Sequence, residues 1–197
     1  MGTTASWVRS HRMIAFFALA YALSWSLIPF GSFLPTGALI AALVVIAIAD
    51  GRPGFRELGS RIVRWRVHWI WYVAALGVPI AIHVVTITAN AHLSSAAISF
   101  DQLDPWYGLV VVFASRLVDP LNGPVAEEPS WRGFAQPTLQ QSNSPLVATL
   151  ILATLVTVYA WLFNRADGSV LITLLAHAAE GTVRRRPCGP TASTPTA

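Results

Sequence analysis

Long apolar stretches make up most of the chain, and short polar segments separate them. A helix needs about 20 mainly apolar residues to cross a bilayer, and fewer where neighbouring helices cover its ends. The pattern therefore predicts an all-α fold, a polytopic transmembrane helical bundle of about six spans. The six predicted helices are residues 13–30, 36–49, 69–90, 107–122, 145–163 and 169–181.

The composition supports a membrane protein. Of the 197 residues, 54% are hydrophobic and only 11% are charged, whereas a soluble domain is about 25% charged. The eight Trp residues favour the boundary between lipid and water. We therefore expect a single transmembrane domain over residues 1–182, followed by a disordered polar tail over residues 183–197.

The basic residues are placed as membrane anchors. All 13 are Arg, and most flank an apolar stretch, at Arg9, Arg12, residues 52–66 and residues 184–186. Anionic lipid at the inner leaflet attracts such residues. This placement predicts an integral membrane protein with a cytoplasmic N-terminus, whose partner is membrane lipid and not nucleic acid.

The same rule assigns a side to each loop. The segment 50–68, with five Arg, is expected inside, and the loop holding Asp101 and Asp104 outside. The segment with Arg132 then returns inside, and residues 164–168 lie outside, where Arg165 is an exception to the rule. Residues 184–186 end inside.

Two adjacent carboxylates are the first candidates for chemistry. Arg132 follows Glu128 by four residues, which places both on one face of a helix. Glu127 then points elsewhere and is available as a general base toward water. An ordinary ion pair closing a helix end has the same spacing, so both interpretations stay open. Because proline suits a first turn, Pro129 suggests that the helix begins near Glu128.

Other polar residues within apolar stretches have simpler interpretations. Arg116 and Asp119 can pair at positions i and i+3, which neutralises both in lipid. His83 is expected to make a buried polar contact between helices, in the outer half of its span and far from Glu127.

Two longer motifs resemble a known family. The stretch GPVAEEPSWRGFAQPTLQ, residues 123–140, resembles the first motif of the CAAX-protease and bacteriocin-processing (CPBP) membrane family, written EExxxR and continued by WRGF. WLFNRADGSVLITLLAHA, residues 161–178, is similar to the family's last motif, in which a turn leads into a helix with a functional His. The resemblance covers roughly residues 50–182.

The resemblance implies an intramembrane metalloendopeptidase of a bacterial or archaeal cell membrane. Glu127 would activate a water for attack on a peptide bond of a membrane-associated peptide or protein. Glu128 and Arg132 would shape and charge the site, and His177 would be a metal ligand or an oxyanion donor. The implied cofactor is a divalent metal, zinc, held by Glu127 and His177.

The chain also departs from the family pattern. The middle motif, with a functional His, is missing from SPLVATLILATLVTVYAWLFNR, residues 144–165, and its loss is expected to fuse two family helices into one. Gly181 stands where the family commonly has Asn or Asp. Three alternatives therefore remain: a catalytically degenerate member that binds a peptide or partner protein, a small transporter subunit with a polar relay, or the product of a damaged gene.

Overall fold

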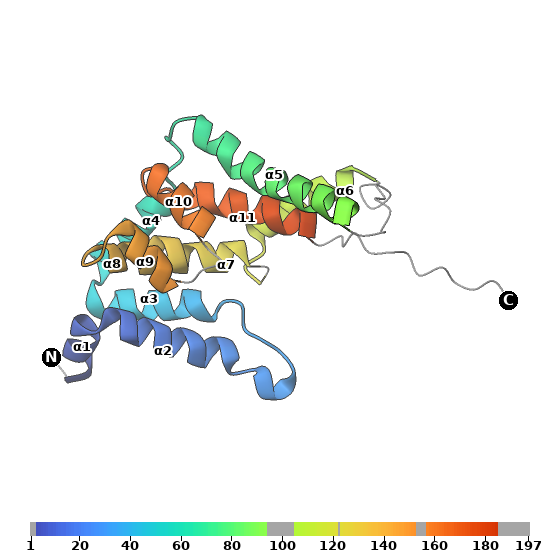
Figure 1. The fold of residues 1–197 in the computed structure, drawn as a ribbon. Helices are drawn as coiled ribbons and strands as arrows, with labels where there is room; N and C mark the ends of the chain where they lie inside the picture. Colours follow the sequence, from blue (N-terminus) through green and yellow to red (C-terminus); the bar gives the residue numbers. More distant parts are fainter. Residues whose placement is uncertain (1–2, 94–104, 122, 153–156, 185–197) are drawn as a thin grey trace.

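The computed structural model describes residues 3–93, 105–121, 123–152 and 157–184, and the regular elements in these ranges are helices. The predicted all-α fold is thus confirmed for this part of the chain. The helices form a layered bundle with the N-terminus at one end (Figure 1). They are α1 (Thr3–Ser10), α2 (Arg12–Trp25), η1 (Ile28–Phe30), α3 (Gly37–Ala49), α4 (Arg52–Ile62), α5 (Ile70–Leu93), α6 (Tyr107–Val118), α7 (Pro124–Glu128), η3 (Pro129–Ala135), α8 (Gln136–Gln140), α9 (Pro145–Leu152), α10 (Thr157–Arg165) and α11 (Val170–Arg184).

Two helical stretches are long and apolar enough to cross a membrane. They are Arg12–Phe30, with 19 residues, and Trp69–Leu93, with 25. Three of the other predicted spans are shorter apolar helices, α3, α6 and α11. Among the described residues, the structure therefore matches the predicted number of about six spans only in part. Asp101, Asp104 and most of the predicted tail lie outside the described residues.

Small residues bring α2 and α3 close together as a hairpin. The side chains of Ala20 on α2 and of Ala41 and Ala42 on α3 are buried. Short side chains at a helix interface let the two backbones approach closely. Phe16, also buried, carries the packing onward, because its ring contacts the ring of Phe134 on η3 at a centroid distance of 5.4 Å.

Gly37 gives a direct test of this close approach. A Cβ atom at Gly37 would lie 2.5 Å from the backbone nitrogen of Ser24, which cannot move without displacing α2. We expect Gly37→Ala to lower the free energy of unfolding by about 1–3 kcal/mol, as overpacking usually does. Thermal unfolding in detergent measures the change. Gly59→Ala is the control, because a Cβ there meets nothing within 4 Å; an equal loss in both variants would contradict the prediction.

A second apolar cluster joins α5, α10 and α11. Its buried members are small or branched side chains that fill the space between these helices. Figure 1 shows α11 beside α5 along most of its length. Helices α7 and η3 pack between this cluster and the α2–α3 hairpin, so they connect the two halves of the core. The buried residues of the second cluster are Ala75, Leu162, Ala166, Ile172 and Ala176.

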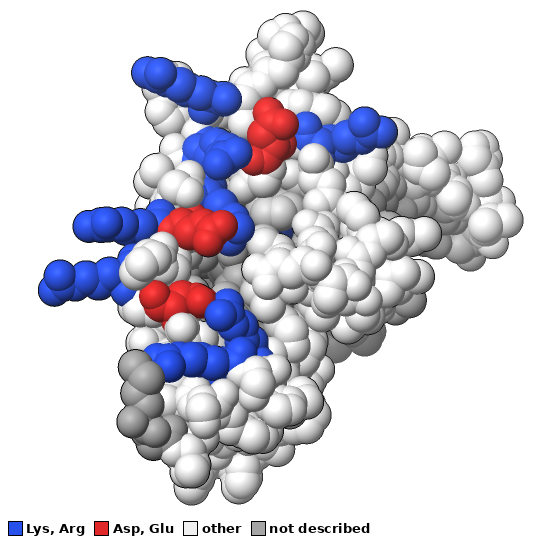
Figure 2. Space-filling view, turned by 90° about the vertical axis from the view of Figure 1, so that its left-hand side faces the viewer, with Lys and Arg blue, Asp and Glu red and all other residues white. Residues whose placement is uncertain are grey.

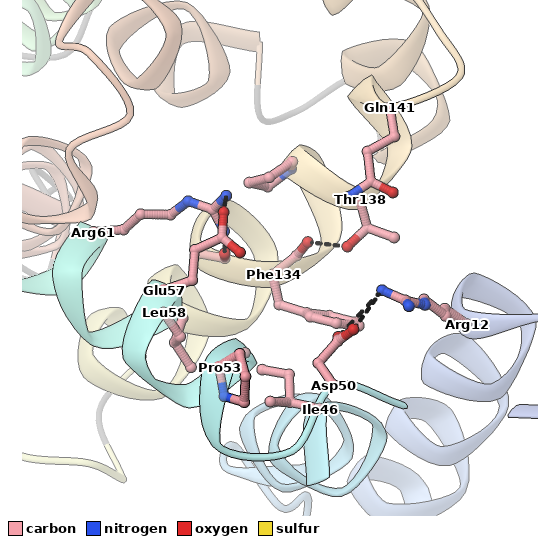
Figure 3. A pocket seen from close by; sticks show the side chains of 13 residues that line it. Arg12, Ile46, Asp50, Pro53, Glu57, Leu58, Arg61, Phe134, Thr138 and Gln141 are labelled. Carbon is pink, nitrogen blue, oxygen red and sulfur yellow. Dashed lines mark hydrogen bonds and ion pairs between the residues drawn. The ribbon is translucent and has the colours of Figure 1, made fainter. Parts of the chain in front are cut away.

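Charged residues gather at one end of the bundle. Figure 2 shows Arg, Asp and Glu side chains over the end where α1, α4 and α8 lie in Figure 1. A pocket of about 240 Å³ opens there between α2, α3, α4, η3 and α8 (Figure 3). Two ion pairs line it, Arg12 with Asp50 at 2.9 Å and Arg61 with Glu57 at 2.6 Å. Each of these four charged side chains therefore has a partner within the pocket.

Arg61 also ties the charged end to the helix that carries the first motif. Its Nη1 donates to the carbonyl oxygen of Gly133 at 2.8 Å. Partial burial lowers the pKa of Arg61, Glu57 opposes this shift, and Arg64 adds to it. An arginine remains charged at neutral pH despite such a shift, so α4 is held to η3 by a charge-assisted hydrogen bond.

Residues 164–168 lie beside the Arg-rich segment, which contradicts the prediction that the two segments lie on opposite sides of a membrane. Arg64 Nη1 donates to the carbonyl oxygen of Asp167, and Ser169 Oγ donates to the carbonyl oxygen of Arg64 at 2.7 Å. This turn therefore lies at the same end of the bundle as the Arg-rich segment. That prediction took residues 145–163 as one crossing, whereas Gln141 before this stretch and Asp167 after it both lie at the charged end of the bundle.

Candidate functional site

The first motif begins at a glycine with left-handed backbone geometry. Gly123 has φ +89°, which other residues rarely adopt. Its carbonyl oxygen accepts hydrogen bonds from the amides of Ala126 and Glu127, at 3.0 and 2.8 Å. Helix α7 therefore begins at Pro124, and the expectation that it begins near Glu128 is wrong. Proline suits this position because a first-turn amide has no partner within the helix.

A π-helical segment, η3, follows α7 without a break. The amide of Gln136 donates to the carbonyl oxygen of Trp131, five residues back, as a π-helix requires. Pro129 has no amide hydrogen to donate within the helix. Ser130 Oγ instead donates to the carbonyl oxygens of Glu127 and Ala126, at 2.8 and 3.2 Å. Such segments often occur at functional sites.

Glu128 is the centre of a buried polar cluster. Its Oε1 lies 2.9 Å from His177 Nδ1 on α11, and its Oε2 lies 3.6 Å from Arg132 Nε. The side chain of Glu128 is 1% exposed and that of Arg132 is 4% exposed. The predicted pairing of Glu128 with Arg132 is confirmed, and the structure adds His177, 49 residues further along the chain. Two motifs that were predicted separately thus meet at one carboxylate.

Tyr159 on α10 completes this cluster from the side. Its ring stacks on the ring of His177 at a centroid distance of 5.3 Å and an interplanar angle of 23°. The guanidinium carbon of Arg132 lies 5.5 Å from the centre of the same ring, in a cation–π contact. Tyr159 therefore fixes the plane of His177, whose Nδ1 is already held by Glu128.

Glu127 faces a different part of the site. A point next to the Cα of Gly123, where another residue would carry its Cβ, lies 3.7 Å from Glu127 Oε1 and 3.9 Å from His177 Nε2. Arg116 Nη2 on α6 lies 3.8 Å from the same point. Glu127 is partly exposed, unlike Glu128. The two adjacent carboxylates therefore have the separate environments that the sequence predicted, one buried and paired, the other open.

The two motifs also meet at a second place. Gln136 Nε2 and Gln140 Nε2 both donate to Asn164 Oδ1, at 3.2 and 2.8 Å. The two glutamines come from the end of the first motif and Asn164 from the start of the second. These hydrogen bonds hold α8 against α10, which fixes the position of Tyr159 relative to η3.

The residues present do not make up a zinc site of the usual kind. A catalytic zinc ion takes three protein ligands, and the described residues contain no group of three His, Cys, Asp or Glu side chains that could hold a metal. Glu127 Oε1 and His177 Nε2 are two atoms that could bind a metal ion, and both lie within 4 Å of the point beside Gly123. Glu128 accepts from His177 on the other ring nitrogen, as carboxylates beside metal-bound histidines do. His83, on α5, belongs to no such group, and its buried Nε2 has no hydrogen bond within the described part of the chain.

Sequence reasoning missed the roles of Arg116 and Tyr159. The expected pairing of Arg116 with Asp119 is wrong, because Asp119 lies past the end of α6 and its Oδ1 accepts from the amide of Leu121 at 2.9 Å. The guanidinium of Arg116 instead lies against Gly181 of α11. An arginine within an apolar stretch was a signal of function, but only a local partner was considered. Tyr159 gave no signal, because an aromatic residue is ordinary in an apolar helix.

Comparisons with known proteins do not identify the chain. No protein-family model, no curated protein and no solved structure matches it.

Proposed function

We propose that the chain is an intramembrane protease similar to the CPBP family, which cleaves peptide bonds of membrane-associated peptides or proteins. Glu127 is the general base that activates water. Glu128, Arg132 and His177 form the polar cluster that supports the site. The observation that carries this proposal is the meeting of Glu128 with His177, because it joins the two motifs on which the family resemblance rests.

The exposed surface favours a membrane environment. Large apolar side chains along α5 are exposed, and soluble proteins rarely expose an apolar patch of this extent. Arg, Asp and Glu side chains also gather at one end of the bundle, as they would at a membrane surface (Figure 2). The exposed apolar residues of α5 include Ile70, Val73, Leu76, Ile80, Ile82, Val84, Val85 and Leu93.

The contacts at the charged end suggest a revised topology. Gln141, just before α9, lines the pocket there together with Arg12, while Asp167, just after α10, accepts from Arg64. We place this end at the cytoplasmic surface, so that α9 begins on that side and α10 ends on it. Helices α2 and α5 span the bilayer, and the shorter α3, α6 and α11 lie within it. In this topology α11 begins at the cytoplasmic surface and runs toward the outer side of the membrane. The inner side that was expected for residues 184–186 is therefore reversed.

The chemistry follows from the side chains of the site. Glu127 accepts a proton from a water as the oxygen of that water attacks the peptide carbonyl carbon. His177, held on Nδ1 by Glu128, presents Nε2 to the same space. Arg132 balances the charge of Glu128, which leaves Glu127 as the carboxylate open to water. A zinc ion bound by Glu127 and His177 would supply Lewis acidity, but it would need a further protein ligand.

Reconstitution tests the proposal against its two main rivals. The purified protein is placed in liposomes with a quenched fluorescent peptide that carries an apolar anchor, and cleavage, ion flux and bound zinc are measured in parallel. We expect cleavage without ion flux. Flux without cleavage would support a transporter subunit, whereas peptide binding with neither would support a catalytically degenerate member of the family. Zinc that is stoichiometric in the wild type and lost in His177→Ala would show that a third ligand completes the site.

A further inference from the structure

Arg116 lies inside the candidate site, although it belongs to neither motif. It stands on the last turn of α6, and its guanidinium crosses to α11, where it lies directly against Gly181. A Cβ at Gly181 would overlap the guanidinium atoms. The position of Arg116 therefore depends on a glycine at that point of α11.

Three polar atoms from three helices surround the space beside Gly123. They are Glu127 Oε1 of α7, Arg116 Nη2 of α6 and His177 Nε2 of α11, at 3.7, 3.8 and 3.9 Å from the point where a Cβ would lie. Within the described part of the chain, no other heavy atom outside Gly123 and its chain neighbours is closer to that point. This one point thus has three groups within 4 Å, a carboxylate that can take a proton, a permanent cation and an imidazole nitrogen. A reacting oxygen needs a base and a donor within reach of one position in this way.

The charge of Arg116 suits the oxygen that becomes negative during peptide hydrolysis. A guanidinium stays protonated at neutral pH and donates hydrogen bonds in a fixed plane. Donors that are already oriented toward a developing oxyanion contribute about a hundredfold to a thousandfold each to the rate. Glu127 cannot serve this oxygen because a carboxylate only accepts. Of the two remaining groups, Arg116 is the one with a permanent positive charge.

We propose that Arg116 is a further catalytic residue that donates to the carbonyl oxygen of the scissile peptide bond. This inference rests on the proposed protease function. As water attacks the carbonyl carbon, its proton passes to Glu127 and the π electrons of the carbonyl move to the oxygen, which Arg116 stabilises as an oxyanion. When the intermediate collapses, the C–N bond breaks and the leaving nitrogen takes the proton from Glu127. The products are a carboxylic acid and an amine.

The test compares the binding of two matched peptides. One carries a phosphinate, a stable anionic mimic of the tetrahedral intermediate, and the other carries a neutral amide in its place. We expect the wild-type protein in detergent to bind the phosphinate at least about a hundredfold more tightly, as transition-state analogues do. Arg116→Gln should abolish this preference while keeping the affinity for the amide peptide, which also reports that the variant is folded. Arg116→Lys should retain part of the preference.

Gly181→Ala provides an independent variant that leaves Arg116 in the sequence. Its methyl group would occupy the space of the guanidinium, so we expect the phosphinate preference to fall as in Arg116→Gln. Gly77→Ala on α5 is the matched control, because a Cβ there meets nothing within 4 Å. It should keep the preference of the wild type.

The outcomes separate this inference from the proposed function. If the wild type cleaves peptide but Arg116→Gln keeps the phosphinate preference, the role of Arg116 is overturned and the protease stands. If the preference depends on Arg116 but no peptide is cleaved, the oxyanion site stands and the protease function is overturned. Equal affinity of the wild type for both peptides would overturn the role of Arg116, whether or not cleavage is seen.

Discussion

Glu127→Gln is expected to reduce peptide cleavage by about 10²- to 10⁴-fold, the usual contribution of a general base. The amide has the shape of the carboxylate, but it cannot take a proton from water. Glu127 is partly exposed, so the substitution should change the free energy of unfolding by no more than about 0.5 kcal/mol. Initial cleavage rates in proteoliposomes, measured beside thermal unfolding, separate the loss of catalysis from a loss of folding.

Glu57→Gln is the matched control for this variant. Glu57 is also a glutamate in an Arg-containing helix, α4, and it lies four residues before Arg61. Its side chain is 64% exposed at the charged end of the bundle, in the pocket of Figure 3. We expect its cleavage rate to stay within about twofold of wild type, because surface substitutions have small effects. A rate for Glu127→Gln that is equally unchanged would exclude Glu127 as the base.

Glu128→Ala is expected to lower the free energy of unfolding by about 3–5 kcal/mol, the cost of removing one partner of a buried ion pair. The substitution leaves the guanidinium of Arg132 buried without its carboxylate, and it removes the acceptor of His177 Nδ1. Glu57→Ala removes the partner of Arg61 at the same i,i+4 spacing, but at an exposed site, so we expect a loss below about 1 kcal/mol. Unfolding in mixed detergent micelles measures both.

A double variant distinguishes charge from packing at the same position. Glu128→Gln combined with Arg132→Met removes both charges while nearly keeping the volume of the side chains. Replacement of a buried ion pair by uncharged groups is often neutral or stabilising, so we expect most of the stability lost in Glu128→Ala to return. A double variant as unstable as Glu128→Ala would show that side-chain shape at these positions matters more than charge.

Much of the fold could be predicted from the sequence because lipid limits the choices. Long apolar stretches in lipid can satisfy their backbone groups as helices, so the helical class and the helices of residues 13–30 and 36–49 followed from hydropathy. The spacing of Glu128 and Arg132 predicted their pairing, since residues four apart share a helix face. The meeting of Glu128 with His177 could be expected only from the family resemblance, because no local pattern links residues 49 positions apart.

Contacts between residues that are far apart along the chain could not be predicted from the sequence. The side assigned to residues 164–168 depended on counting crossings, and a stretch that begins and ends at the same end of the bundle changes every later assignment. Arg64 donates to the backbone carbonyl oxygen of Asp167. Rules based on side-chain type cannot predict such a contact, because every residue has this oxygen. For Arg116 only the nearest acidic residue in the sequence was considered, but α6 ends at Val118 and Asp119 instead accepts from the amide of Leu121.

The π-helical segment η3 accommodates one extra residue without changing the direction of the helix that follows. A π-helix holds one more residue in its hydrogen-bonded loop than an α-helix does, so η3 is equivalent to an α-helix with an inserted residue. An α-helix rotates by about 100° per residue, so the same residues in α-helical geometry would rotate α8 by about 100° relative to α7. Gln136 and Gln140 would then turn away from Asn164 while Glu128 and Arg132 kept their pairing. The wider turn therefore keeps the two contacts between the motifs in one register.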